Sequence, residues 1–228
     1  MNKNGLKPDT EYDPRATETT RERYQRNARF YDWMGSSMEK RHAPWREQLW
    51  RMIIGPSVLE VGVGTGRNMP YYPEGVEVTA IDLTPGMLDR AKARAQALGK
   101  PVQLNLGDVQ RLNYADQTFD SVVATCVFCS VPNPVLGLQE IRRVLKPGGT
   151  VLLLEHMRSE NPVVGKIMDW INPLIVRLMG ANINRRTVEN VRQSGLEIVQ
   201  VEKLDGDGIF KRIIARRPME TTVQGLSQ

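Results

Sequence analysis

The chain has 228 residues, of which 40% are hydrophobic and 25% are charged, and its formal net charge is +5. This composition is typical of a globular domain with a sizeable core, and it excludes collagen-like and largely disordered chains. The two cysteines, Cys126 and Cys129, allow neither a disulfide framework nor a four-ligand zinc site, so no metal is expected. The first 20 residues lack the apolar segment of a signal peptide, and no apolar run could span a bilayer, so we expect a cytoplasmic protein.

The N-terminal quarter predicts a mobile segment followed by helices. Charged residues and prolines over 1–19 predict a flexible arm. Residues 20–54 follow two helical patterns and predict an N-terminal helical cap, in which Tyr24 and Tyr31 share one face of the first helix. In the charged stretch that follows this helix, His42 is expected at the surface.

The middle of the chain alternates between strands and helices. Strands are predicted at 57–61, 77–82, 103–107, 121–127 and 150–155, and helices at 84–98 and 135–145. The alternation predicts a parallel sheet that is covered by helices. On the fourth strand, Cys126 and Cys129 are expected to point to opposite faces as small buried residues rather than as a redox pair.

The C-terminal third departs from this alternation. Residues 162–183 are strongly apolar and predict a lid insertion, with packing against the sheet as the plainer alternative. A helix at 187–194 and strands at 196–203 and 209–216 predict a terminal antiparallel hairpin. We therefore expect a single α/β domain with a Rossmann-like, seven-stranded, mostly parallel sheet at 55–217, followed by a flexible tail at 218–228.

A glycine-rich loop follows the first strand, with glycines at 62, 64 and 66. Glycines allow a tight turn and a close approach of a ligand to the backbone. In a dinucleotide-binding loop the third glycine would stand at Arg67, where a long side chain would disturb the packing of helix on strand. Glu60, just before the loop, suits an ammonium group better than a pyrophosphate. Both features favour a nucleoside that carries an amino acid over a dinucleotide.

Acidic residues also end the next two strands. Asp82 stands 20 positions after Gly62, where a carboxylate can accept hydrogen bonds from both ribose hydroxyls. Asp108 follows the third strand and is placed to accept from an exocyclic amine. The alternative for each acid is an ordinary helix cap or turn residue.

The motifs together resemble those of the class I S-adenosylmethionine-dependent methyltransferases. The stretches are 60–66, 81–88, 107–109 and 145–149, and the resemblance spans about 20–216. It implies S-adenosylmethionine as the cofactor, with the acid before the glycines near its methionine end, the second-strand acid on ribose, and Asp108 with the Val109 N–H on adenine. The implied cofactor-binding set is Tyr24, Glu60, Gly62, Gly64, Gly66, Asn68, Asp82, Leu83, Met87, Asp108, Val109, Thr125 and Cys126.

Within this class, four stretches resemble the ubiquinone/menaquinone C-methyltransferase and phosphatidylethanolamine N-methyltransferase-like group: 28–32, 128–132, 154–156 and 161–185. They imply an amphipathic acceptor, either a phospholipid amine or a quinone. The apolar segment could also touch the inner face of a membrane, with Lys166, Arg177, Arg185 and Arg186 near lipid headgroups, so peripheral membrane contact is expected. The alternatives are a small-molecule thiol or amine methyltransferase and, from another class, a non-catalytic S-adenosylmethionine-binding protein or a basic nucleic-acid-binding module. Nucleic acid is not expected as a partner, because the basic residues are scattered.

Two residues are candidates for work on the acceptor. His156 follows the fifth strand at the ligand edge of the sheet and could act as a base or orient the acceptor. Its alternative is a hydrogen-bonded loop histidine. Tyr31 belongs to the helix that covers the cofactor in related proteins, and its alternative is core packing.

Overall fold

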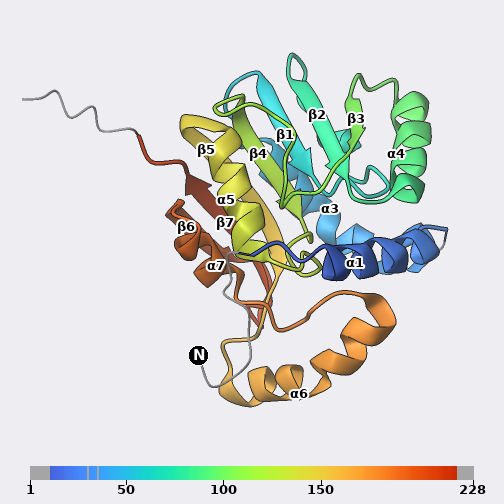
Figure 1. The fold of residues 1–228 in the computed structure, drawn as a ribbon, viewed down its shortest axis with the longest axis vertical. Helices are drawn as coiled ribbons and strands as arrows, with labels where there is room; N and C mark the ends of the chain where they lie inside the picture. The colour runs from blue at the N-terminus through green and yellow to red at the C-terminus, as the bar shows by residue number, and fades with distance from the viewer. Residues whose placement is uncertain (1–10, 30, 35, 220–228) are drawn as a thin grey trace, which may run out of the picture.

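The computed structural model describes residues 11–29, 31–34 and 36–219 (Figure 1). The outer parts of the predicted arm and tail, 1–10 and 220–228, lie outside these residues. One sheet has the strand order β3-β2-β1-β4-β5-β7-β6. Its strands are β1 (Ser57–Val61), β2 (Glu77–Asp82), β3 (Gln103–Leu106), β4 (Phe119–Thr125), β5 (Leu145–His156), β6 (Glu197–Lys203) and β7 (Phe210–Arg216).

Strands β1 to β5 pair in parallel, whereas β7 is antiparallel to both of its neighbours, β5 and β6. The predicted fold class, a mostly parallel seven-stranded sheet with a terminal antiparallel hairpin, is confirmed. The chain runs outward from β1 to β3 and then crosses to β4 on the other side of β1. A crevice forms at the carboxyl ends of the strands where the order reverses in this way, and this is where ligands bind in open α/β sheets.

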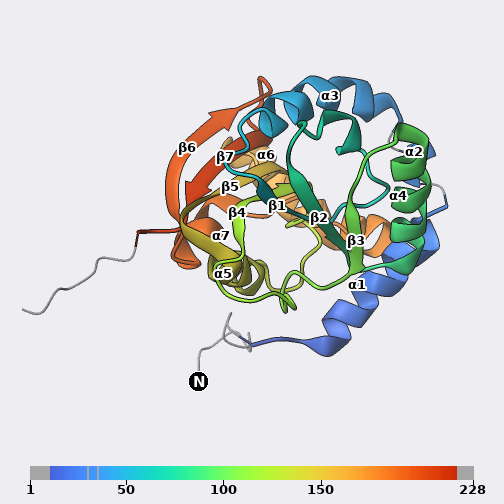
Figure 2. The same cartoon turned by 90° about the horizontal axis from the view of Figure 1, so that it is seen from above.

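Helices cover both faces of the sheet (Figure 2). The helices are α1 (Pro14–Asn27), α2 (Tyr31–Met34), α3 (Ser36–Trp50), α4 (Pro85–Leu98), α5 (Pro134–Val144), α6 (Pro162–Met179) and α7 (Thr187–Gln193), with a 3-10 turn, η1, at Met69–Tyr71. One apolar core contains residues of α5 and α7, and the other contains residues of α3 and α4. Adjacent residues of β4 take opposite sides, Val122 in the first core and Val123 in the second. Burial on both faces explains the nearly continuous apolar sequence of the central strands.

Local capping moves one predicted boundary. Asp13 caps α1, and its Oδ1 accepts from the backbone N–H groups of Arg15 and Ala16 at 2.9 and 3.1 Å. Because the cap is followed by Pro14 in the first turn, the helix begins there. Residues 14–19, which the sequence assigned to the flexible arm, thus form the first turns of α1. The first of the two helices predicted within 20–54 is also divided, since α1 ends at Asn27 and α2 begins at Tyr31.

The strand predicted at 121–127 ends two residues earlier than expected. Cys126 has a φ of +54°, which belongs to the left-handed region and ends an extended strand. Cys126 and Cys129 therefore lie in the turn after β4, and the prediction that they occupy a strand is wrong. The Cys129 thiol instead points back, and its Sγ is 3.3 Å from the carbonyl oxygen of Cys126.

Helix α6 lies apart from the sheet, on the far side of α1 in the view of Figure 1. Asn161 caps its N-terminus through hydrogen bonds from Val163 N and Val164 N, and Gly180 ends it with a φ of +83°. No described helix, α6 included, is both long enough and apolar enough to cross a bilayer. The apolar insertion is thus one amphipathic helix.

Candidate functional site

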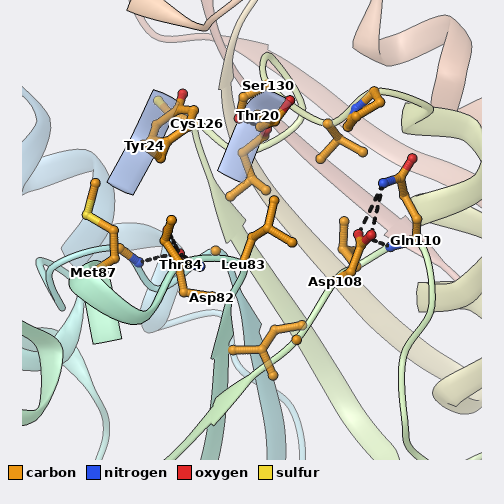
Figure 3. Close-up of a pocket in the computed structure, with 18 of the residues that line it drawn as sticks. Thr20, Tyr24, Asp82, Leu83, Thr84, Met87, Asp108, Gln110, Cys126 and Ser130 are labelled. Atoms are coloured by element: carbon orange, nitrogen blue, oxygen red, sulfur yellow. Dashed lines mark hydrogen bonds between the residues drawn. The ribbon is translucent and has the colours of Figure 1, made fainter. Parts of the chain in front are cut away.

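A pocket opens at the carboxyl ends of β1, β2, β3 and β4, the edge at which ligands bind in open α/β sheets. Figure 3 shows Asp82 and Asp108 on its strand side, and Thr20 and Tyr24 of α1 opposite them. The pocket brings together most of the predicted set: Tyr24, Tyr31, Gly62, Gly64, Asp82, Leu83, Met87, Asp108, Val109, Thr125 and Cys126. Of the predicted residues, Glu60, Gly66, Asn68 and His156 do not line it.

The three loop glycines all have positive φ, but they serve different ends. A Cβ atom on Gly62 would lie 2.5 Å from a methyl group of Val127, and one on Gly66 would lie 2.8 Å from Met69. A Cβ atom on Gly64 would meet nothing within 4 Å. Gly62 and Gly66 therefore permit packing within the protein, whereas Gly64 leaves open space where a ligand can reach the backbone.

Asp82 ties the glycine loop to the end of β2. Its Oδ2 accepts from Gly64 N and its Oδ1 from Thr84 N, both at 2.9 Å, and the Thr84 hydroxyl also donates to Oδ1. Burial raises the pKa of this carboxyl, and the hydrogen bonds oppose that rise. Because each carboxylate oxygen can accept more than one hydrogen bond, Asp82 keeps acceptor capacity toward the pocket. Asp82 thus anchors a turn, as the plainer alternative holds, and also lines the pocket.

Asp108 is held by a residue that the sequence analysis missed, Gln110. The Gln110 side-chain amide donates to Asp108 Oδ1 at 3.1 Å and Oδ2 at 3.2 Å, and its backbone N–H donates to Oδ1 at 2.9 Å (Figure 3). The same amide reaches Thr17 Oγ1 of α1 at 3.2 Å and accepts from Asn133 N at 3.0 Å. Gln110 therefore orients the acid and joins α1 to the pocket wall.

Glu60 lies beneath the pocket in a buried polar network. Its two oxygens accept from Asn68 Nδ2, at 2.6 Å, and from the hydroxyl of Tyr72. Asn68 also donates to Thr125 Oγ1 at 3.1 Å and accepts from Arg46 at 2.7 Å. Burial raises the pKa of Glu60 to about 7. The network connects Glu60 to the pocket through Asn68 and Thr125, the second of which lines it.

Asp32 connects the N-terminal helical cap to the glycine loop. The sequence analysis did not single out this residue. Asp32 Oδ1 accepts from Thr65 Oγ1 at 2.6 Å and from Arg67 Nε at 3.1 Å, and Oδ2 accepts from Arg94 at 3.1 Å. Arg67 also donates to the carbonyl oxygen of Tyr31 and pairs with Glu39 of α3. The residue that argued against a dinucleotide loop therefore holds α2 over the loop.

Tyr24 and Tyr31 come from two helices, yet their ring centroids are 6.4 Å apart in the pocket. Burial raises the pKa of Tyr24 well above its usual value and that of Tyr31 to about 12. Both phenols consequently stay protonated near neutral pH. They can donate a hydrogen bond or present an aromatic face to a cation in the pocket.

His156 ends β5, as predicted, but its ring packs edge-on against Phe210, with centroids 6.1 Å apart. Burial lowers its pKa, so the imidazole is neutral near pH 7. Next to it, His42 is only 6% exposed and lies between Trp45 and Phe210, with ring centroids 5.3 and 4.7 Å away. The predicted surface position of His42 is wrong, because α3 packs this face against β7. Burial lowers the pKa of His42 to about 4.

The turn after β4 is fixed by Glu155, whose Oε1 accepts from Val127 N at 2.8 Å and from Phe128 N at 3.1 Å. Burial raises the pKa of the Cys126 thiol to about 12 and raises that of Cys129 well above its ordinary value, so neither is a reactive thiolate. Within the described residues, no three His, Cys, Asp or Glu side chains form a group that could hold a metal.

Comparison with known proteins places this pocket in a family context. A family model described as a methyltransferase domain matches residues 59–153. A phosphatidylethanolamine N-methyltransferase of Cereibacter sphaeroides is 41% identical over 112 residues, 48% of this chain and 55% of that protein. A thiol S-methyltransferase of Rattus norvegicus is 32% identical over 155 residues, 64% of this chain and 62% of that protein. These two matches span little more than half of the relatives' length.

Another relative matches a longer part of the chain, and solved structures share its fold. A demethylmenaquinone methyltransferase of Lactobacillus johnsonii is 32% identical over 191 residues, 75% of each protein. Among solved structures, a SAM-dependent methyltransferase of Methanosarcina mazei has a TM-score of 0.61 at 21% identity and covers 73% of this chain and 95% of that one. At this identity, the likeness concerns the fold alone.

Proposed function

Because the chain belongs to the class I S-adenosylmethionine-dependent methyltransferases, we propose that it methylates an amphipathic acceptor, with a phosphatidylethanolamine-type amine ahead of a quinone. The main support for this reaction is the pocket, in which Gly64, Asp82 and Asp108 lie together at the ends of neighbouring strands. The first-ranked acceptor is supported by the relative from Cereibacter sphaeroides.

The residues of the pocket fit S-adenosylmethionine. Asp82 offers acceptors for two ribose hydroxyls, and the open backbone at Gly64 leaves room beside them. Asp108, with its orientation set by Gln110, offers acceptors for the adenine amine, and Leu83 and Met87 supply apolar contact for the base. Thr125, which is joined to Glu60 through Asn68, stands toward the methionine end. Glu60 is thus a positioning residue in this proposal.

S-adenosylmethionine supplies a methyl group on a positively charged sulfur, which is already activated for transfer to a lone pair. The chain's own tasks are to align the acceptor and to exclude water. Tyr24 of α1 and Tyr31 of α2 line the pocket, and in this proposal their rings would contact the cationic end of the cofactor. An amine acceptor has to lose its proton, and the neutral imidazole of His156 can accept one. His156 does not line the pocket, so this role requires an acceptor that reaches the end of β5, where His156 lies.

A thiol acceptor is the second candidate, and the relative from Rattus norvegicus favours it. The two candidates differ in where the acceptor resides. A phospholipid amine must be collected from a bilayer, whereas a small thiol diffuses freely. The exposed apolar side chains of α6 favour the first. We accordingly propose a cytoplasmic protein that works at the inner face of a membrane.

Transfer of labelled methyl from S-adenosylmethionine to a panel of acceptors tests the proposal. The panel contains phosphatidylethanolamine vesicles, a demethylated quinone in detergent and a small alkyl thiol. We expect label in the phospholipid amine, and Tyr31→Phe and His156→Phe should lower its yield. Label in the thiol alone would replace the first candidate by the second. Binding of adenosylhomocysteine without transfer to any acceptor would point to a non-catalytic module.

A further inference from the structure

Helix α6 carries an exposed apolar stripe. Of the large apolar side chains that are exposed in the described chain, half belong to this one helix. Val163, Ile167, Trp170, Leu174 and Leu178 are 65%, 53%, 83%, 59% and 66% exposed. Their spacing of three and four residues places them on one face of the helix. We call these five residues the α6 stripe.

The opposite face of α6 is attached to the protein. Met168 is buried, and its sulfur lies 3.3 Å from Ser159 N. Asn172 bonds to Asn182 at 3.2 Å and to Ile183 N at 2.9 Å. These contacts fix the orientation of α6, with the stripe facing outward. The stripe is therefore not a part of the core that has failed to pack.

The charges beside the stripe are positive. At about 100° per residue, Lys166 and Arg177 fall at one border of the stripe, next to Trp170. The one acid of α6, Asp169, is paired with Arg158 at 2.9 Å, and this hydrogen bond lowers its pKa. The helix thus presents an apolar stripe with a cationic border and a neutralised acid. This combination is complementary to an anionic lipid surface, in which apolar side chains enter the acyl region and cations meet headgroups.

The C-terminal end of α6 is tied to the pocket. Both the backbone N–H and the side-chain amide of Asn182 donate to the carbonyl oxygen of Cys129, at 2.8 and 2.9 Å. Arg185 donates to the carbonyl oxygen of Val131 at 2.8 Å, and Val131 lines the pocket. A helix lying in a lipid surface would consequently hold the pocket close to that surface.

We propose that α6 lies in the plane of an anionic bilayer, with the α6 stripe inserted, and that this seats the pocket where a lipid acceptor is available. The inference deepens the proposed function and rests on it for the acceptor, but the docking itself is measured separately. A second copy of the chain fits the stripe less well, because it would bring the same cations, Lys166 and Arg177, to the shared surface.

Vesicle flotation tests the docking. The probes are vesicles of equal parts phosphatidylcholine and phosphatidylglycerol, and vesicles of phosphatidylcholine alone. We expect the full chain to bind the anionic vesicles and Trp170→Glu to bind them about tenfold or more weakly. Val199→Glu is the matched control, since Val199 on β6 is another exposed apolar residue, at 53%. The control should bind vesicles like the unmodified chain, and both variants should keep the thermal shift caused by adenosylhomocysteine.

The cationic border gives a second measurement. Lys166→Ser and Arg177→Ser should each weaken binding to anionic vesicles by about fivefold and reduce its dependence on salt, with little effect on neutral vesicles. Retained vesicle binding in Trp170→Glu would overturn the proposal. A dimer in gel filtration that Trp170→Glu dissociates, without vesicle binding by the unmodified chain, would also overturn it in favour of a second copy.

Failure of the docking and failure of the proposed function have different signatures. If the chain binds vesicles through α6 but does not methylate phosphatidylethanolamine, the docking stands and the assigned acceptor is wrong. If the chain methylates a short-chain, monomeric phosphatidylethanolamine but does not bind vesicles, the acceptor stands and the docking is wrong.

Discussion

In the strand-end pocket, polar groups are buried and hydrogen-bonded within the chain, whereas on α6 large apolar side chains are exposed to water. Asp82 lines the pocket, Glu60 and Asn68 lie behind it, and each of the three has partners on a neighbouring strand or loop. The α6 stripe has no such partner, and α6 makes no extensive contact with any other helix or strand of the described chain.

The pocket and the α6 stripe are therefore suited to ligands in different ways. A pocket with satisfied polar groups is already arranged, so binding does not require its side chains to be ordered again. An apolar stripe lowers the free energy only when something outside the chain covers it. We therefore expect substitutions in the pocket to change both stability and cofactor affinity, and substitutions in the stripe to change neither.

The largest expected effect is on cofactor affinity in Asp82→Ala. The variant should bind adenosylhomocysteine at least about a hundredfold more weakly, because two hydrogen bonds to a charged group are lost at about 1.5–3 kcal/mol each. Isothermal titration calorimetry measures it. The matched control is Asp120→Ala, since Asp120 also holds a backbone N–H, that of Ser57 at 3.0 Å, but lies at the opposite end of the strands. Equal losses of affinity in the two variants would contradict the assignment of the pocket.

Stability should separate the sheet from α6. Leu152 is fully buried in β5, so Leu152→Ala should lower the free energy of unfolding by about 2–5 kcal/mol. Trp170→Ala should change it by no more than about 0.5 kcal/mol, because Trp170 is 83% exposed. Urea denaturation measures both. A large loss in Trp170→Ala would mean that the stripe is packed against the chain in solution.

The buried acid Glu60 should make stability depend on pH. Its pKa rises from 4.5 to about 7 on folding, so the folded chain keeps a proton that the unfolded chain has released. Stability should then fall as the pH rises from 4.5 to 7, by roughly 1 to 3 kcal/mol for this group. Glu155, whose pKa is also raised to about 7, adds to this slope, whereas His42, whose pKa is lowered to about 4, opposes it, so the test is the difference in slope between the unmodified chain and Glu60→Gln.

The control for this slope is Asp169→Asn on α6. The pKa of Asp169 lies below its ordinary value of 3.8, so the group does not titrate above pH 4.5. Its replacement should leave the slope unchanged when unfolding is measured in urea across this range. A slope in Glu60→Gln as steep as that of the unmodified chain would show that Glu60 is not the titrating group.

The smallest expected effect distinguishes two open glycines. Gly64 and Gly75 both have positive φ, and a Cβ atom added to either would meet nothing within 4 Å. Alanine at either position should lose a similar amount of stability, about 1–2 kcal/mol. Only Gly64→Ala should also weaken adenosylhomocysteine binding, by about tenfold, because its methyl group enters the pocket. Similar affinities in the two variants would place the cofactor away from this loop.

The strand-end features were predictable because each follows an apolar run within a few residues. The parallel strands, the glycine loop and the acids at 82 and 108 all have this local signature, and the structure brings the glycine loop and both acids to one pocket. The ends of helices and strands were less predictable. The positive φ of Cys126 ends β4. Helix α1 begins at its capping residue, Asp13, which lies in the charged segment that was predicted to be a flexible arm.

Residues that act through distant partners left no local signal. Gln110 joins Asp108 to α1, Asp32 joins the cap to the glycine loop, and His42 is buried by Phe210. The backbone N–H of Asn133 donates to the side chain of Gln110. This contact indicates the role of Gln110 only once the loops that carry the two residues are known to meet. The contacts of Gln110 with Thr17 and Asn133 and that of Asp32 with Thr65 join residues 23 or more positions apart, so no periodicity or spacing in the chain reports them.

The order of residues alone therefore established the sheet and the acids at its edge, since hydrophobic periodicity and turn residues act over short stretches. Packing between remote segments settled the rest: which groups support those acids, that Glu60 lies behind the pocket, and which side of α6 faces outward. The sequence shows how apolar a helix is, but which of its faces stays exposed depends on how far the neighbouring segments extend over it.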